Sequence, residues 1–204
     1  MMRSAIFALA LVAAALVPVF AQAQPATGVR PGNSVQNWTV EPTISRLSFV
    51  SQFDGTAFTG TFGRWTAQIR FDPTRLSQSS IVAVIDMASA RTGSADRDQS
   101  MPTTDWFNVA AFPTATFRSS QINALGPGRY EAVGVLTLRG VSRPLTLPFS
   151  LVMAGQGARQ TAHARARLSL NRVVFGVGQG PWAQGDVVPA AVSVTLDLTA
   201  RRSP

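Results

Sequence analysis

Short segments in which apolar and polar residues alternate recur along most of the chain, and this pattern constrains the fold more than any other feature. Successive side chains of a β-strand point to opposite faces, so alternation indicates strands with one apolar and one polar face. About eight such strands, closely spaced, are typical of an antiparallel sandwich or barrel, so we predict an all-β domain. The segments are residues 46–49, 65–71, 81–85, 114–118, 131–139, 145–149, 163–170 and 192–199.

Residues 92–111 break this alternation. Acids and arginines come first, Trp106 and Phe107 follow, and the spacing is helical in two short pieces separated by Pro102. We therefore expect a short helical excursion that covers one side or mouth of a barrel.

The start of the chain has the features of an export signal. A positive Met1–Arg3 precedes an apolar stretch from Ala5 to Val19, and Ala21-Gln22-Ala23 gives the small-x-small cleavage pattern. The stretch is shorter than the ~20 apolar residues of a spanning helix. We predict a signal peptide over residues 1–23, cleaved near Ala23, a flexible lead-in over 24–36 and one domain over 37–201.

Composition excludes several classes of site. The chain has no cysteine and one histidine, which excludes disulfides, thiolate metal sites, covalent haem and multi-histidine metal centres. All 18 basic residues are arginine and the formal net charge is +8, which would suit acidic partners. The arginines are dispersed, however, and even the group Arg165, Arg167 and Arg172 is interpreted as solvated surface.

The predicted inward faces carry many small residues, namely Ala67, Ala83, Ala115, Ala132, Gly134, Ala164 and Ala166. An eight-stranded barrel is near the size at which side chains fill the interior or leave room for one ligand. Small inward residues favour an interior with room for a ligand, although they could equally fit the taper of a filled barrel. We predict a ligand-binding lining formed by Phe49, Trp65, Ile69, Phe117, Ala132, Leu136, Phe149 and Ala166.

Candidate catalytic and anion-binding features are weak. His163 lies on a strand face with arginines and is interpreted as a solvated surface residue, since a catalytic base needs a nucleophile and an orienting partner. Asp96, Asp98 and Asp105 lie close in sequence, but the Asp-x-Asp-x-Asp-Gly spacing of a calcium loop with its terminal Glu is missing, so an ion-pair or helix-start role is expected. The glycines of residues 176–180 lack the lysine of a phosphate loop, which leaves a loop between strands.

Several separated motifs, in order between Trp38 and Ala200, resemble those of the YceI-like family of exported lipocalin-like proteins. They are Arg91–Asp98, Asp105–Ala110, Phe112–Phe117, Gly134–Leu147, and Asn171-Arg172 shortly before Phe175-Gly176. The resemblance implies an extended antiparallel eight-stranded lipocalin-like barrel whose apolar interior binds a polyisoprenoid or similar long-chain lipid, such as a quinone tail. It implies no catalysis and no covalent cofactor.

The chain departs from this family at two positions. Many relatives have Asp-Pro-x-His-Ser where this chain has Glu41–Ser45, and a second histidine where this chain has Phe53. A head-group contact made by either histidine would be lost here. Residues 175–182 resemble a subgroup that accompanies a membrane cytochrome of the b type, which would suit a quinone-related role.

Two functions are weighed. The first is a periplasmic binding or carrier protein for a long-chain lipid. The second is an envelope enzyme, hydrolase-like, that uses Asp98 or His163, for which the sequence supplies no convincing pair. Nucleic-acid binding is disfavoured by export and by the lack of a basic stripe. The oligomeric state stays open, with a homodimer among the alternatives.

Arg97 and Asp98 form the most family-like pair in the chain. Neighbours on a helix point about 100° apart, so the two are not expected to pair with each other. We expect Asp98 to meet a backbone amide or another arginine, and Arg97 to meet a strand-end carbonyl or an acid. An anchoring role is favoured over contact with a ligand head group.

Overall fold

The computed structural model describes residues 35–203. The predicted signal peptide and most of the lead-in lie outside the described residues. Val35 and Gln36, predicted to belong to the lead-in, pack on the domain: Val35 is buried, and the carbonyl of Gln36 accepts a hydrogen bond of 2.9 Å from the amide of Phe71. None of the described helices is both long and apolar enough to span a membrane.

The described chain forms eleven strands and seven short helices. The strands are β1 (Asn37–Val40), β2 (Arg46–Phe53), β3 (Thr56–Phe62), β4 (Trp65–Arg70), β5 (Ser80–Asp86), β6 (Ala90–Arg91), β7 (Thr114–Gly126), β8 (Arg129–Leu138), β9 (Val141–Ala154), β10 (Thr161–Asn171) and β11 (Ala191–Arg202). One α-helix, α1 (Ala95–Ser100), is accompanied by the 3-10 helices η1 (Pro42–Ile44), η2 (Leu76–Gln78), η3 (Met87–Ser89), η4 (Gly157–Arg159), η5 (Val173–Phe175) and η6 (Gly180–Trp182).

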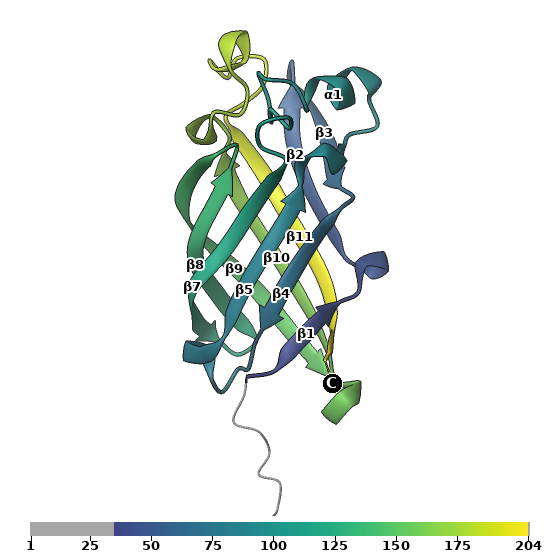
Figure 1. Ribbon diagram of the computed structural model, residues 1–204, viewed down its shortest axis with the longest axis vertical. Helices are drawn as coiled ribbons and strands as arrows, with labels where there is room; N and C mark the ends of the chain where they lie inside the picture. The colour runs from purple at the N-terminus through teal and green to yellow at the C-terminus, as the bar shows by residue number, and fades with distance from the viewer. Residues whose placement is uncertain (1–34, 204) are drawn as a thin grey trace, which may run out of the picture. The chain divides into compact units, whose positions relative to one another are not determined.

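Eight of the strands close into an antiparallel barrel, as predicted (Figure 1). They follow the order β1-β4-β5-β7-β8-β9-β10-β11, and β1 pairs back onto β11, with Trp38 opposite Arg202. Beyond β1 the other half of β11 pairs with β2, with Leu196 opposite Leu47. β3 pairs with β2 and β6 pairs with β3, so these three strands extend the wall toward the end that carries α1.

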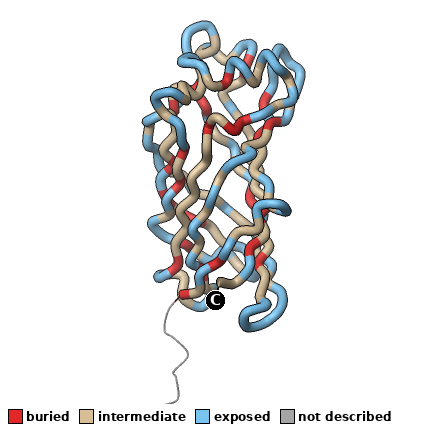
Figure 2. Tube along the Cα trace, turned by 45° about the vertical axis from the view of Figure 1, so that its right-hand side comes forward, coloured by how far each residue is buried: buried red, intermediate tan, exposed pale blue. Residues whose placement is uncertain are grey.

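Burial follows the period of two that the sequence shows. Along β9 intermediate and exposed positions alternate from Leu145 to Ala154. In Figure 2 buried positions occur along the strands, whereas the loops at both ends of the barrel are largely exposed. Because each strand turns one face inward, the apolar side chains line the lumen.

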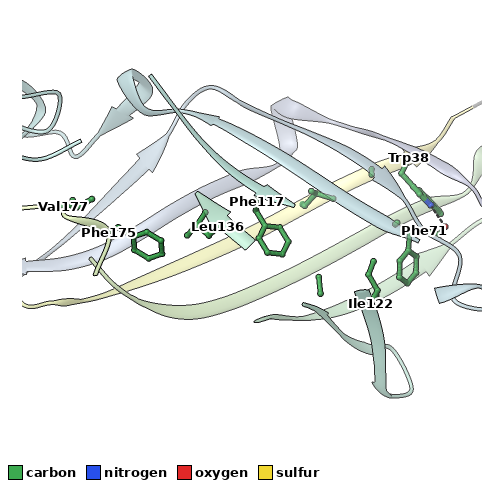
Figure 3. Packing of buried hydrophobic residues seen from close by; sticks show 11 residues of the cluster. Trp38, Phe71, Phe117, Ile122, Leu136, Phe175 and Val177 are labelled. Carbon is green, nitrogen blue, oxygen red and sulfur yellow. Dashed lines mark hydrogen bonds between the residues drawn. The ribbon is translucent and has the colours of Figure 1, made fainter. Parts of the chain in front are cut away.

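Buried aromatic side chains close both ends of the lumen. Figure 3 shows the labelled core residues strung along the barrel, from Val177 and Phe175 at one end to Trp38 and Phe71 at the other. The indole Nε1–H of Trp38 donates to the carbonyl of Phe71 at 2.9 Å, which fixes the ring across that end. Phe117 and Leu136 lie between these two ends (Figure 3).

Two segments cover the end of the barrel at which Phe175 and Val177 lie, at the top of Figure 1. The first, the α1 segment, comprises residues 92–113, and the second, the β10–β11 loop, comprises residues 172–190. The carbonyl of Asp105 accepts hydrogen bonds from the amides of Gly178 (2.8 Å) and Gln179 (2.7 Å). The rings of Trp106 and Trp182 also pack together, with centroids 5.6 Å apart, so the two segments form one cover.

The predicted helical excursion is only partly helical. Helix α1 ends at Ser100, and residues 101–112 form turns, so the second helical piece predicted after Pro102 is wrong. Proline lacks the backbone N–H needed within a helix, and Asn108 adopts a left-handed conformation (φ 48°) that ends any helical run. The predicted position over one mouth is confirmed.

Candidate functional site

The barrel encloses an apolar cavity of about 520 Å³. That volume falls in the range of about 300–1,000 Å³ typical of sites that bury a small organic ligand. Inward faces of the barrel strands and both covering segments contribute to its wall. Most lining side chains are apolar, and the polar ones belong to β2 or to the covering segments: Ser51, Ser94, Asp96, Arg97, Ser100 and Arg172.

Seven of the eight residues predicted to line a ligand site face this cavity. They are Phe49, Trp65, Ile69, Phe117, Leu136, Phe149 and Ala166. The eighth, Ala132, belongs to the core but not to the cavity wall: it is 0% exposed and lies between Ile122 of β7 and Leu147 of β9 in the sheet. It belongs to the cluster of buried side chains that includes Phe71 and Ile122. Contact of these residues with a ligand remains a prediction.

The small inward residues have two different causes. Ala67, Ala83, Ala115, Ala164 and Ala166 all line the cavity, so their size leaves space in the lumen.

Gly134 is small for a different reason. A Cβ there would lie 2.1 Å from the carbonyl oxygen of Arg118, next to the register shift between Ser119 and Gln121. Gly134 therefore permits a close backbone approach at a bulge and contributes no room for a ligand.

Asp98 anchors the start of the α1 segment. Its carboxylate accepts hydrogen bonds of 2.7 Å from both the amide and the hydroxyl of Thr92. Partial burial of this carboxyl opposes its ionisation, but the hydrogen bonds from Thr92 outweigh it and leave the pKa of Asp98 below its ordinary value. The backbone-amide contact is the one expected for this residue.

Arg97 makes different contacts from those expected. Its Nε–H donates to the hydroxyl of Thr92 at 3.3 Å, and its guanidinium carbon lies 4.6 Å from the ring centroid of Phe58. Neither partner is a carbonyl or an acid, so that expectation is wrong. The side chain lines the cavity and lies over an aromatic ring of its wall.

Arg172 organises the β10–β11 loop, and its interpretation as solvated surface is wrong because the residue is only 5% exposed. A guanidinium has five N–H donors. All five are directed at backbone carbonyls, and burial lowers the pKa of Arg172. The acceptors are Pro189 (3.1 Å), Val177 (2.7 Å), Gly178 (3.3 Å), Trp182 (2.5 Å) and Val188 (2.5 Å).

The glycines of this loop serve that arrangement. Gly178 has φ 80°, and a Cβ there would lie 2.0 Å from Nη1 of Arg172. This position therefore needs glycine for both its backbone conformation and the space of the guanidinium. The weak phosphate-loop pattern in the sequence is explained by loop packing.

Of the two positions at which relatives carry histidine, one reaches the cavity. Phe53 lines it, is 42% exposed, and packs on Trp182 with ring centroids 6.3 Å apart. Ile44 lies in η1, is exposed and does not line the cavity.

The two residues considered for a hydrolytic function lie far apart along the barrel. Asp98 belongs to α1 at the covered end, whereas His163 faces Thr199 near the end that carries the C-terminus (Figure 1). His163 contacts Asp197 at 2.6 Å, and Arg165 contacts the other oxygen of that carboxylate at 3.1 Å. The hydrogen bond from His163 lowers the pKa of Asp197 most. The structure does not bring Asp98 and His163 into one cleft.

A closed eight-stranded antiparallel barrel around an apolar cavity is the architecture of lipocalin-like proteins. The YceI-like domain family matches residues 38–200, and the chain belongs to this family. The UPF0312 protein of Vibrio cholerae is 30% identical over 115 residues, which are 54% of this chain and 61% of that protein. The chain thus spans about three-fifths of the length of this curated relative.

Solved structures share the fold. BcnA of Burkholderia cenocepacia is 32% identical with a TM-score of 0.71, over 78% of this chain and 98% of that one. A polyisoprenoid-binding domain of Saccharophagus degradans, implicated in plant cell wall breakdown, is 19% identical with a TM-score of 0.64, over 82% and 99% of the two chains.

Proposed function

We propose that this protein is a periplasmic binding or carrier protein that holds a polyisoprenoid or another long-chain lipid, a quinone among them, inside its barrel. The observation that carries the proposal is the cavity itself: about 520 Å³ of lumen, with apolar side chains along its length and polar ones only toward the covered end. An amphipathic ligand with a long apolar tail and a small polar head matches this division.

The physical basis is burial of the tail. Transfer of apolar surface from water contributes about 25 cal/mol per Å², so each 100 Å² of tail buried is worth about 2.5 kcal/mol before the cost of ordering the chain. Membership of the YceI-like family supports a lipid as the ligand, as does the fold shared with a domain described as polyisoprenoid-binding.

Location and partner are part of the proposal. Export rests on the signal-like residues 1–23, which lie outside the described residues. A membrane cytochrome of the b type is proposed as a partner because residues 175–182 resemble the subgroup that accompanies one; they lie in the β10–β11 loop, at the covered end of the cavity. Fractionation of cells that produce the protein would test the location, and co-purification with the cytochrome would test the partner. Light scattering would test for a homodimer.

The direct test of the ligand is extraction of the purified protein into organic solvent, followed by mass spectrometry. A stoichiometric long-chain lipid is the expected result. Failure to find a lipid, together with no binding of an added quinone or polyprenyl phosphate, would contradict the proposal.

A further inference from the structure

Ser51 is a polar residue in an apolar part of the cavity wall. It lies on the same face of β2 as Phe49 and Phe53, and all three residues line the cavity. The residue is 7% exposed, and its Oγ has no hydrogen-bond partner within residues 35–203. Buried hydroxyls in proteins are nearly always paired, because an unpaired one loses its hydrogen bonds to water without compensation. An unpaired hydroxyl on the wall of a cavity indicates that its hydrogen-bond partner is a ligand bound in that cavity.

Ser51 and Arg97 share a neighbour, Phe58. Ser51 lies opposite Phe58 in the pairing of β2 with β3, and the guanidinium of Arg97 lies over the ring of that same Phe58. Ser51 and Arg97 are therefore both neighbours of Phe58, and all three residues line the cavity at the covered end. Only Nε of Arg97 has a hydrogen-bond partner in the described part of the chain, which leaves its two Nη groups for other acceptors.

The charges at this end favour an uncharged head group. Arg172 also lines the cavity, but its five donors are occupied by backbone carbonyls, so none remains for a ligand. Arg97 is then the one guanidinium of the lining with unoccupied donors, and the exposed acid Asp96, its neighbour in the sequence, also belongs to the lining. A diphosphate carries several negative charges, and one cation beside an acid is a poor match for it.

We propose that Ser51 donates a hydrogen bond from its hydroxyl to an uncharged carbonyl oxygen in the head group of the bound lipid. The head lies at the covered end, and the tail runs along the lumen toward Trp38 and Phe71. This inference rests on the proposed function and assigns the class of head group: a carbonyl-bearing ring or chain end in preference to a diphosphate. Ser51 is then a residue that determines specificity.

The test compares three probes with the same two-isoprene tail: a benzoquinone, a diphosphate and a hydrocarbon without oxygen. Affinities are measured by quenching of tryptophan fluorescence and by calorimetry, for wild type, Ser51→Ala and Ser48→Ala. Ser48 is the matched control, because it lies on the same strand but does not line the cavity. We expect Ser51→Ala to weaken the quinone about threefold to tenfold and to leave the hydrocarbon unchanged, and Ser48→Ala to change neither.

A stability measurement adds a second readout. Since Oγ of Ser51 has no partner in the described chain, ligand-free Ser51→Ala should melt no lower than wild type. A lower melting temperature would show that the hydroxyl has a structural partner, and would overturn the inference.

The remaining outcomes distinguish failure of the inference from failure of the proposed function. Equal quinone affinity in wild type and Ser51→Ala would overturn the inference while leaving lipid binding intact. A diphosphate that binds more tightly than the quinone, and loses that advantage in Arg97→Ala, would overturn the uncharged head. If wild type binds none of the three probes, the proposed function itself fails and the inference falls with it.

Discussion

The guanidinium of Arg172 lies over the indole ring of Trp106, with its carbon 5.4 Å from the ring centroid. Arg172 belongs to the β10–β11 loop and Trp106 to the α1 segment, so this contact joins the two halves of the cover. The same guanidinium holds five carbonyls of its own loop. One side chain thus fixes both the shape of the loop and its seat on the neighbouring segment.

Replacement of Arg172 by methionine should loosen this cover. Methionine fills similar space but has no donor, so the five carbonyls lose their common partner, and we expect a loss of at least about 3 kcal/mol in the free energy of unfolding. Amide hydrogen exchange should accelerate over residues 173–190. Arg172→Lys should recover only part of the loss, since an ammonium has three donors.

The control for this change is Arg167→Ala. Arg167 is exposed on β10 and donates to the hydroxyl of Ser193 at 3.2 Å, so its loss should cost less than about 0.5 kcal/mol. Equal effects of Arg172→Met and Arg167→Ala in urea titrations would contradict the role assigned to Arg172.

Two alanines on the inner face of the barrel should respond differently to enlargement. Ala166 lines the cavity, so Ala166→Phe should place its ring in the lumen, block uptake of a long-chain lipid and leave the fold nearly as stable as wild type. Ala132 is fully buried away from the cavity, so Ala132→Phe should destabilise the protein by ~1–3 kcal/mol through overpacking. Lipid binding and urea unfolding, measured on both variants, check the pair. A large stability loss in Ala166→Phe would indicate a filled lumen at that position.

The alternation in the sequence was sufficient to predict antiparallel strands, because the longest strands each bury one face. It left a sandwich and a barrel open, and the family resemblance is what implied the barrel. All eight predicted segments lie on observed strands, although Phe71 and Arg139 fall one residue beyond them. β1 was missed because four residues are too few to show a period, and yet it closes the barrel. β3 was missed because Gly60 interrupts it, where a Cβ would lie 2.2 Å from the ring of Phe49 on the neighbouring strand.

The site was harder to predict, since alternation gives the direction of a side chain but not its neighbours. Alternation placed both Ala166 and Ala132 on the inner face of the barrel. Only the pairing of Ala132 with Ile122 and Leu147 on the neighbouring strands distinguishes its place in the filled core from the place of Ala166 on the cavity wall. Arg172 follows the last residue of β10, where alternation ends, so no pattern distinguished it from the exposed Arg167. Ser51 carried a signal, a hydroxyl two residues from Phe49 and Phe53 on one face, that a search for apolar positions overlooks.

Arg97→Ala should lower stability modestly, with or without a ligand. A cation–π contact at a partly exposed site is worth about 0.5–1 kcal/mol, and the hydroxyl of Thr92 keeps its bond to Asp98 when the arginine is removed. No buried partner is left unpaired, so we expect a loss of about 0.5–1 kcal/mol, below the ~1–3 kcal/mol that an unpaired buried group would cost. Thermal melts with and without a quinone check this. Unchanged stability with a loss of quinone affinity alone would assign Arg97 to the ligand site and contradict an anchoring role.

The contact between Asp98 and Thr92 should make the α1 segment sensitive to acid. The pKa of Asp98 is lower in the folded protein than its ordinary value of 3.8, so the carboxylate contributes stability above that value, and the contribution is lost as pH falls through the lowered pKa. Asp98→Asn removes this contribution at every pH. We therefore expect Asp98→Asn to be less stable than wild type at neutral pH, and the difference to shrink as both proteins are acidified. Urea unfolding at a series of pH values measures this difference in stability. Asp96→Asn is the control, because the carboxylate of Asp96 has no hydrogen-bond partner within residues 35–203. The stability of that variant should follow that of wild type at every pH. A stability difference for Asp98→Asn that stays constant down to acidic pH would show that the charge of Asp98 does not hold the segment.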